Sequence, residues 1–345
     1  MSRRFALAIA LVLVAVATPA AAARNNSYSL AGAPTVGLVA HYPLDGHAHD
    51  LAGDNDGTVH GAQPTVDRFG RSGGAMHFDG LDDIIEVADD PVFHFTNEFT
   101  LAAWVEPGSL DQAGTIVNKW FALDSYGLWL IGGDWRFTTA TPGGPWGQVR
   151  EISAPAVDRW THLVGVCTGD TMLLYVDGAQ MVTASVEGPL QQSDRPIAIG
   201  SHPAWSAFAG VLDDVRLYDR ALSPDEVGDL FNAPLGVTID IKPGSDANPI
   251  NAEGKGVVPV AILGSDSFDV SAVDTAMVLF GPMEANPKHH GGHLEDVDLN
   301  GYMDLVFHFP VQDTGLVVGD THACLDGLTL HGWPFQGCDT VTVVR

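Results

Sequence analysis

The sequence predicts an all-β protein, a sandwich or barrel followed by a smaller β domain. Its apolar segments are short, rich in β-branched and aromatic residues, and bounded by Gly, Pro, Asn or Asp, as at 99–105, 162–167 and 172–176. Short strands separated by turn residues at this spacing are typical of sandwiches and barrels. A cluster of breaker residues at 232–236 precedes a newly alternating segment, 237–242, so a second β domain is expected to begin there.

Two local elements of the first domain have clear signals. Asp177-Gly178 separates two strand-like segments, and this pair supplies the positive φ values of a type I′ hairpin turn. One short helix is expected after Ser223, because Pro224 suits its first turn and Glu226 completes a capping box. This helix is expected to end the first domain.

The second domain contains further short strand candidates. They are 257–263, 277–280, 305–309 and 341–344. Pro259 lacks an amide hydrogen, so its strand is predicted to lie at a sheet edge or to carry a bulge.

The N-terminus has the pattern of an export signal. Residues 1–23 combine a basic start, an apolar run and a small-residue end, which predicts a cleaved signal peptide, with 24–36 as a linker. No later segment reaches the roughly 20 apolar residues of a membrane helix, so no membrane span is expected in the mature form. We expect a secreted protein, extracellular or periplasmic.

The net charge of the chain limits the classes of partner that it can bind. The 345 residues include 16 Lys and Arg against 43 Asp and Glu, a formal net charge of −27. Such a charge excludes nucleic-acid binding, which depends on neutralising phosphates. We assign part of this excess of acidic residues to predicted calcium ligands and part to a solvated acidic surface.

The three cysteines have different expected fates. Cys324 and Cys338 lie close together in the second domain, and export would expose them to an oxidising compartment, so they are predicted to form a disulfide. Cys167 lies in an apolar strand pattern and is expected to be a buried, inert thiol.

The strongest chemical signal is a nine-residue acidic loop near the C-terminus. Its expected calcium ligands are Asp296, Asp298, Asn300, the carbonyl of Tyr302, and Asp304. Calcium takes six to eight oxygen ligands, which a loop donating from alternate positions supplies, with glycine at the sharp turn. Counted from Asp296, position 12 of the loop is Phe307, where an EF-hand has a glutamate, so a strand is expected to follow the loop. The alternative is an acidic turn that binds no metal.

Several segments, taken in order, resemble the laminin-G-like jelly-roll domain of the concanavalin-A-like superfamily. They are 38–45, 55–57, 78–83, 99–105 and 208–223. The resemblance covers 37–232 and implies two curved antiparallel sheets stacked as a sandwich. Residues 237–345 resemble a β module found at the C-termini of secreted bacterial proteins.

The jelly-roll resemblance implies a second calcium site. In that family an ion often joins the first loop to a late strand, and the matching acids here are Asp54 and Asp56 with Asp213 and Asp214. The alternative is that 54–57 is a turn without metal, because Asp and Asn readily cap turns.

A carbohydrate site needs flat aromatic faces for sugar rings, with polar groups nearby. The candidates are Tyr126, Trp129, Trp135, Trp146 and Trp205, the first four in or near a Gly- and Trp-rich stretch. Trp104 and Trp160 are assigned to core packing instead.

Motifs for catalysis are absent from the sequence. It contains neither a Gly-x-Ser-x-Gly elbow nor the E-x-D-x-x-E pattern of jelly-roll glycosidases. A carboxylate pair drawn from Glu86, Glu106 and Glu151 stays open as an enzyme alternative. The histidines at 289, 290 and 293 are assigned to a solvated loop in preference to a transition-metal site.

We therefore expect a non-enzymatic protein that binds a glycan or an extracellular matrix or cell-surface ligand, with calcium as its cofactor. The alternatives are a polysaccharide hydrolase or lyase on the same scaffold, and a purely structural or adhesive surface protein.

Overall fold

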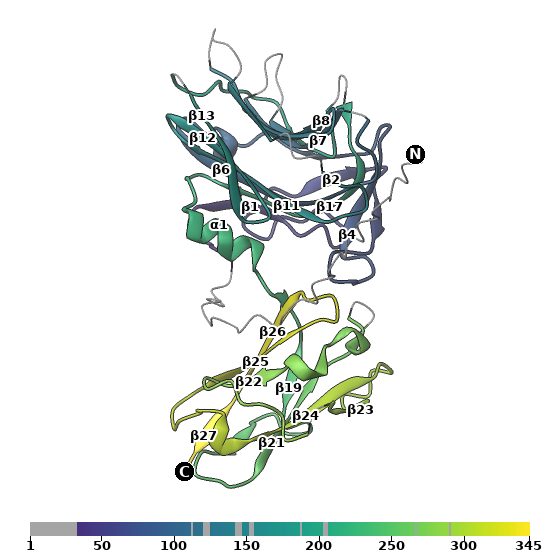
Figure 1. The fold of residues 1–345 in the computed structure, drawn as a ribbon, viewed down its shortest axis with the longest axis vertical. Coiled ribbons are helices and arrows are strands. Elements are labelled where there is room, and N and C mark those ends of the chain that lie inside the picture. The colour runs from purple at the N-terminus through teal and green to yellow at the C-terminus, as the bar shows by residue number, and fades with distance from the viewer. Residues whose placement is uncertain are drawn as a thin grey trace, which may run out of the picture.

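The computed structural model describes residues 33–345 except 112, 120–124, 142–146, 152–154, 187, 203–205, 266–267 and 290. The predicted signal peptide, 1–23, and most of the predicted linker lie outside these residues. Within them, strands β1–β17 share no sheet with strands β18–β27, and the two groups are stacked along the long axis of the molecule (Figure 1). The domain limits, 37–232 and 237–345, stay a prediction from the sequence.

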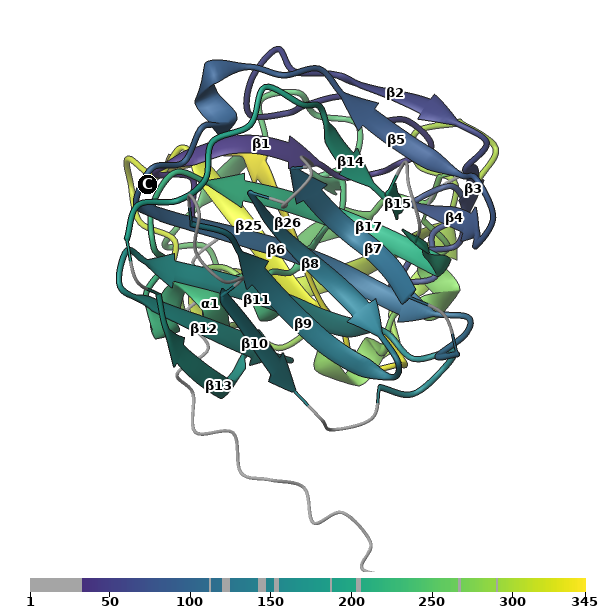
Figure 2. The same cartoon turned by 90° about the horizontal axis from the view of Figure 1, so that it is seen from above.

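The first group and helix α1 form the N-terminal sandwich, in which two antiparallel sheets lie face to face (Figure 2). One sheet runs β13-β12-β11-β6-β17-β4-β3, with β1 also paired to β17; the other runs β10-β9-β8-β7-β14-β5-β2. The first contains β1 (Leu38–Tyr42), β3 (Gln63–Thr65), β4 (Ala75–Asp79), β6 (Glu98–Pro107), β11 (Thr161–Thr168), β12 (Thr171–Val176), β13 (Ala179–Ser185) and β17 (Ala209–Tyr218). The second contains β2 (Gly57–His60), β5 (Ile84–Val87), β7 (Ala113–Lys119), β8 (Tyr126–Ile131), β9 (Asp134–Thr139), β10 (Gly147–Glu151) and β14 (Ile197–Ile199). β15 (Ser201–His202) and β16 (Ser206–Ala207) form a separate ribbon, and a 3-10 turn, η1, covers Pro91–Phe93.

An aromatic cluster joins the two sheets. The ring of Phe99, from β6, lies 5.0 Å from that of Tyr126 and 5.6 Å from that of Phe137, both on the opposite sheet. All three are buried, and burying such rings contributes about 1.5–3 kcal/mol each. Gly165 makes room for this packing, since a Cβ there would lie 2.5 Å from the Phe137 ring. The predicted all-β sandwich is confirmed.

Both local predictions in this sandwich are confirmed. β12 and β13 are joined by Asp177 and Gly178, whose φ angles are 50° and 75°, as a type I′ turn requires. Helix α1 spans Pro224–Phe231, with Ser223 as its N-cap and Glu226 completing the capping box.

The second group of strands forms the C-terminal module. Its sheets are β18-β26-β25-β22, β19-β21-β24-β23 and the pair β20-β27. The strands are β18 (Leu235–Gly236), β19 (Ile239–Ile241), β20 (Pro249–Asn251), β21 (Val257–Ile262), β22 (Leu279–Phe280), β23 (His293–Glu295), β24 (Asp304–Pro310), β25 (His322–Leu328), β26 (Pro334–Thr340) and β27 (Thr342–Val344). The module also contains the short 3-10 turns η2 (Val270–Ala272), η3 (Thr275–Met277) and η4 (Val311–Asp313).

The prediction that the strand containing Pro259 lies at a sheet edge or carries a bulge is wrong, whereas both cysteine predictions are confirmed. β21 lies between β19 and β24 and not at an edge. Pro259 is accommodated because β19 pairs with β21 only as far as Val260.

Cys324 and Cys338 are direct partners on β25 and β26 and form the disulfide. Cys167 is buried, and burial raises the pKa of its thiol, which keeps it unreactive.

The two groups of strands meet through aromatic side chains. Phe69, from the loop between β3 and β4, packs in the hydrophobic core of the C-terminal module. In return Trp333, from the loop between β25 and β26, lies edge-on to Trp104 of the sandwich at 5.4 Å. Across the described residues, no helix has the length and apolar character needed to cross a membrane.

Candidate functional site

The acidic loop predicted to bind calcium connects two paired strands. β23 ends at Glu295 and β24 begins at Asp304, and these two residues face each other in an antiparallel pair. The loop is therefore the tip of a β-hairpin, and both of its ends are held by the strands. The expectation that a strand, and not a second EF-hand helix, follows the loop is confirmed.

Backbone amides inside the loop point toward its own side-chain oxygens. Asn300 N donates to Asp296 and Asp298, at 3.1 Å each, and Tyr302 N donates to the Asn300 amide oxygen at 2.7 Å. Gly301 has a φ of 91°, as expected for the sharp turn, but Leu299 also has a positive φ of 62°. Leu299 is exposed, and a positive φ is uncommon for leucine, so the sequence pattern did not predict this conformation.

The loop concentrates negative charge at one point. Asp296, Asp298 and Asp304 each place one carboxylate oxygen within 4.8 Å of the others. Among the described residues, no Lys, Arg or His forms a salt bridge with these three. An all-oxygen donor set of this charge suits a hard cation such as calcium, so the residues present fit the ion that the sequence predicts.

Asp304 also has a structural role. Its side chain is fully buried, and its two oxygens accept hydrogen bonds from Gly264 N at 2.8 Å and Val297 N at 2.7 Å. The Asn300 amide donates to the Gly264 carbonyl at 3.1 Å. These bonds attach the loop to the segment after β21, so the carboxylates are held in place by the fold.

The second predicted calcium site is not assembled. Among the described residues, three or more potential ligands come within 4.8 Å only in the loop above and at Asp79, Asp82 and Asp83. Asp54 is exposed, and Asp56 accepts a bond from Asp50 N at 2.8 Å and pairs with His49 at 3.1 Å. The expectation of an ion shared with Asp213 and Asp214 is therefore corrected.

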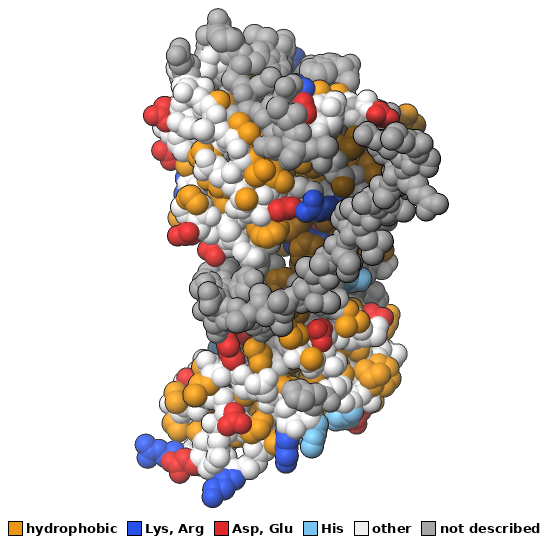
Figure 3. All heavy atoms as spheres, viewed as in Figure 1, with side chains coloured by type: hydrophobic (Ala, Val, Ile, Leu, Met, Phe, Trp, Pro, Cys, Tyr) orange, Lys and Arg blue, Asp and Glu red, His pale blue; other side chains and the backbone are white. Residues whose placement is uncertain are grey.

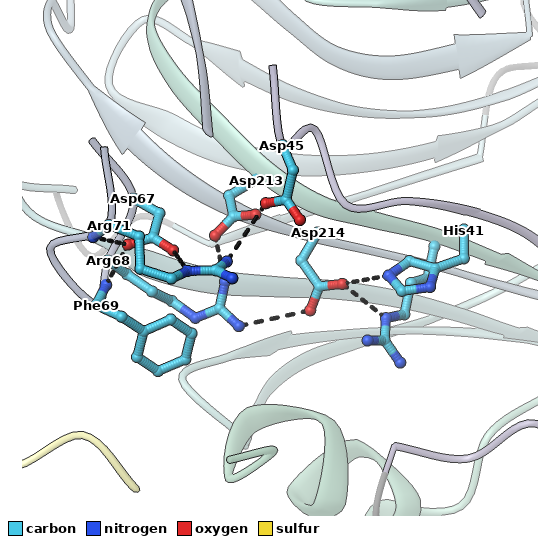
Figure 4. A network of polar contacts seen from close by, with 9 residues as sticks. His41, Asp45, Asp67, Arg68, Phe69, Arg71, Asp213 and Asp214 are labelled. Carbon is cyan, nitrogen blue, oxygen red and sulfur yellow. Dashed lines mark hydrogen bonds and ion pairs between the residues drawn. The ribbon is translucent and has the colours of Figure 1, made fainter. Parts of the chain in front are cut away.

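Asp213 and Asp214 instead pair with cationic side chains (Figure 4). Arg68 is paired with Asp213 and lies 3.6 Å from Asp214. Asp214 also contacts Arg216 at 2.9 Å and His41 at 2.7 Å. Both aspartates lie at a bulge in β17, where Asp214 has a φ of 52°. The bulge turns two consecutive carboxylates toward the arginines.

The arginines set the charge state of this cluster. Burial disfavours ionised Asp214, but Arg216, His41 and Arg68 outweigh it and hold the pKa of Asp214 well below its usual range. Burial raises the pKa of Asp213, while contact with Arg68 acts against that rise. A cation is thus already supplied by the chain itself, and no metal is needed to offset these charges.

The predicted ligand-binding aromatics are corrected where the structure describes them. Tyr126, Trp129 and Trp135 are each only 1% exposed. The Tyr126 hydroxyl donates to the Phe93 carbonyl at 3.0 Å, and Trp129 Nε1 donates to Thr138 Oγ1 at 2.8 Å. Buried rings cannot stack on a sugar that arrives from solvent. Trp146 and Trp205 lie outside the described residues.

The remaining candidates fall into three kinds. His289 is exposed, which agrees with a solvated loop; His293 is also exposed but begins strand β23, and His290 lies outside the described residues. Asp79, Asp82 and Asp83 form an acidic group that sequence reasoning missed, although the segment 78–83 had already been noted for its resemblance. Acidic side chains otherwise appear scattered over the face in Figure 3, as a solvated acidic surface predicts.

Comparison with known families defines the class of the sandwich. Residues 78–228 match a laminin G family that is described as the concanavalin A-like lectin/glucanases superfamily. The N-terminal sandwich therefore contains a laminin-G-like, concanavalin-A-like jelly-roll domain, as the sequence resemblance indicated.

Individual relatives extend over parts of the chain. Adhesion G-protein coupled receptor V1 of Danio rerio is 29% identical over 148 residues, which are 39% of this chain and 2% of the receptor. The chain thus spans only a small fraction of that relative's length.

Similar solved structures include the binding domain of Paraclostridial Mosquitocidal Protein 1, at 18% identity and a TM-score of 0.50, covering 66% of this chain and 64% of that one. Domain 4 of AbnA, a GH43 extracellular arabinanase from Geobacillus stearothermophilus, in complex with arabinotriose, has 20% identity and a TM-score of 0.48, covering 56% and 97%. At such identities a likeness shows the fold alone.

Proposed function

We propose that this protein is exported and binds a glycan or an extracellular surface without catalysing a reaction, and that calcium stabilises its C-terminal loop. The observation that carries the proposal is the match of 78–228 to a superfamily of lectins and glucanases. The fold alone does not assign a function, because sites are grafted onto a common sandwich. The proposal therefore also rests on the uncompensated carboxylates of the loop 296–304, which a calcium ion would neutralise.

A polysaccharide hydrolase or lyase is the second candidate, and one observation favours it. Burial and the neighbouring Asp158 raise the pKa of Glu106, and a general acid needs a raised pKa. Against it, Glu86 and Glu106 come from strands of opposite sheets, β5 and β6, and the sequence contains no catalytic motif. We favour the binding role for this reason.

The test combines stability, binding and turnover. Thermal unfolding is measured in calcium and in chelator, a glycan array is probed in both, and a polysaccharide panel is assayed for released reducing ends or unsaturated products. We expect a higher melting temperature in calcium, a glycan signal and no turnover. Turnover would replace the proposal with the hydrolase or lyase. A calcium shift without any glycan signal would instead favour a structural or adhesive protein.

A further inference from the structure

We propose that the pocket between the N-terminal sandwich and the C-terminal module binds one sugar ring of an uncharged glycan. The inference rests on the proposed function and gives it a location and a charge preference. The pocket has a volume of about 390 Å³, in the lower part of the range of roughly 300–1,000 Å³ in which ligand pockets lie. Its described lining contains none of the aromatic residues that the sequence predicts to bind a ligand.

Three aromatic side chains form one part of the lining. Trp160 precedes β11, Phe231 ends α1, and Trp333 comes from the C-terminal module. All three are half-buried, so each is held by packing and still exposes part of its ring. Aromatic faces of this kind suit the apolar face of a sugar ring. The assignment of Trp160 to core packing is therefore corrected, because the ring lies before the strand and not within it.

Polar side chains form the remainder of the lining. Glu106, Asp158 and Asp177 offer carboxylate oxygens, and Arg159 offers a guanidinium. Carboxylates accept hydrogen bonds from sugar hydroxyls, and a guanidinium donates to hydroxyl or ring oxygens. Aromatic rings with a small number of convergent polar groups are the composition expected of a ligand site.

The charge of the lining selects against acidic sugars. Arg159 is already paired with Asp177 at 2.8 Å, so Glu106 and Asp158 contribute the negative charge that remains. An anionic sugar would bring a third negative charge next to these two, and like charges at an interface are unfavourable. An uncharged ring meets no such repulsion.

The pocket is held in shape from both sides. Asp158 N donates to the Pro107 carbonyl at 2.9 Å, which holds Asp158 beside the end of β6. Asp177 accepts a bond from His162 N at 3.0 Å. On the opposite side Trp333 contacts both Trp104, at 5.4 Å, and Phe69, at 6.1 Å. A preformed site loses little conformational entropy when it binds.

Two polar atoms are buried behind this aromatic lining. Trp104 Nε1 and His162 Nδ1 are buried without a hydrogen-bond partner among the described residues. Their rings lie 4.9 Å apart, and both rings contact Phe231 of the pocket lining. Buried polar atoms without a partner are uncommon in folded proteins, and these two lie directly behind the pocket lining.

The test measures binding of defined oligosaccharides to the purified full chain by calorimetry. The uncharged probes are cello-, xylo-, manno- and galacto-oligosaccharides, and the anionic probes are oligogalacturonate and sialyllactose. Trp160→Ala is compared with Val157→Ala, an exposed residue of the same loop that does not line the pocket. Trp333→Ala is compared in the same way with the exposed Leu330→Ala.

We expect an uncharged probe to bind and both tryptophan variants to weaken it by about tenfold or more, with both controls unchanged. We also expect the double variant Glu106→Gln, Asp158→Asn to gain affinity for the anionic probes. Melting curves identify any variant that fails to fold, and Trp160→Ala lies outside the aromatic contacts between the two groups of strands.

Three results would contradict the inference, each in a different way. Glycan binding that survives both tryptophan variants would place the site elsewhere and leave the proposed function intact. Absence of binding to every probe and to the glycan array would overturn the proposed function, and with it this inference. Stronger binding of anionic than of uncharged probes by the unaltered chain would contradict the charge preference.

Discussion

The loop 296–304 and the bulge at Asp213 and Asp214 both gather carboxylates, but they offset the negative charge in different ways. At the bulge, Arg68 and Arg216 lie against the two acids in a largely buried network. In the loop, three carboxylates converge without a cationic side chain among the described residues. The same sequence signal, clustered aspartates beside a strand, therefore predicts a metal site in one place and was misleading in the other.

The difference follows from what lies next to each cluster in space. Arg68 comes from a loop about 145 residues before Asp213 in the chain. Its guanidinium also lies 4.2 Å from the Phe69 ring and 4.6 Å from the Trp104 ring, at the boundary with the C-terminal module. The bulge network thus supports the contact between the two groups of strands, whereas the loop carboxylates accept hydrogen bonds from backbone amides and pair with no cationic side chain among the described residues.

The largest expected effect tests the buried network. Arg68→Met leaves Asp213 buried without its guanidinium, and breaking a buried ion pair costs about 3–5 kcal/mol. Urea unfolding should show this loss. His49→Gln, which removes a pair exposed to solvent, should change the free energy of unfolding far less than Arg68→Met does. Equal effects for the two variants would mean that the network does not stabilise the fold.

The next effect tests the loop. A calcium ion present at 100 times its dissociation constant would stabilise the protein by about 2.7 kcal/mol. Asp298→Asn should remove most of the calcium-dependent rise in melting temperature, because it deletes one charge and leaves the bonds of Asp304 intact. The exposed Asp313→Asn in the same module is the control and should keep the full response. An unchanged response in Asp298→Asn would contradict a metal site in this loop.

A variant for which no effect is expected tests the corrected site. The double variant Asp54→Asn, Asp56→Asn should leave the calcium response unchanged, because these residues are not assembled with Asp213 and Asp214. Asparagine keeps an oxygen that can accept the bond from Asp50 N, so little loss of stability is expected. Differential scanning calorimetry with and without calcium is the measurement. A reduced calcium response would restore the shared ion and break the comparison drawn above.

The last effect concerns the partly buried pair of Arg220 and Glu226 and depends on pH. Arg220 and the cap of α1 lower the pKa of Glu226 from 4.5 to about 2. Because the folded-state pKa is the lower one, the stabilisation is complete above pH 4.5 and is lost as the pH falls from 4.5 toward 2. Glu226→Gln should flatten the dependence of melting temperature on pH in this window. If the slope is the same in both proteins, the pair does not contribute.

Local elements were predictable because their causes are local. Turn chemistry at Asp177-Gly178 and capping chemistry at Ser223 act within a few residues, and both elements are present as expected. The pairing of Cys324 with Cys338 was also predictable, because the two cysteines lie close together in the sequence. The acidic loop 296–304 was recognisable for the same reason, since all of its predicted ligands lie within nine residues, and three of its carboxylates do converge.

The sequence by itself determined the β class, the jelly-roll resemblance, the hairpin, the helix and the acidic loop. Only the tertiary structure decided that Asp213 and Asp214 face arginines, that Trp129 and Trp135 are buried, and that Trp160 and Trp333 line one pocket. Each of those outcomes depends on which segments, far apart in the chain, pack against each other. A pattern of residues reports which side chains alternate along a strand, but it does not report what the opposite sheet or the next domain places beside them.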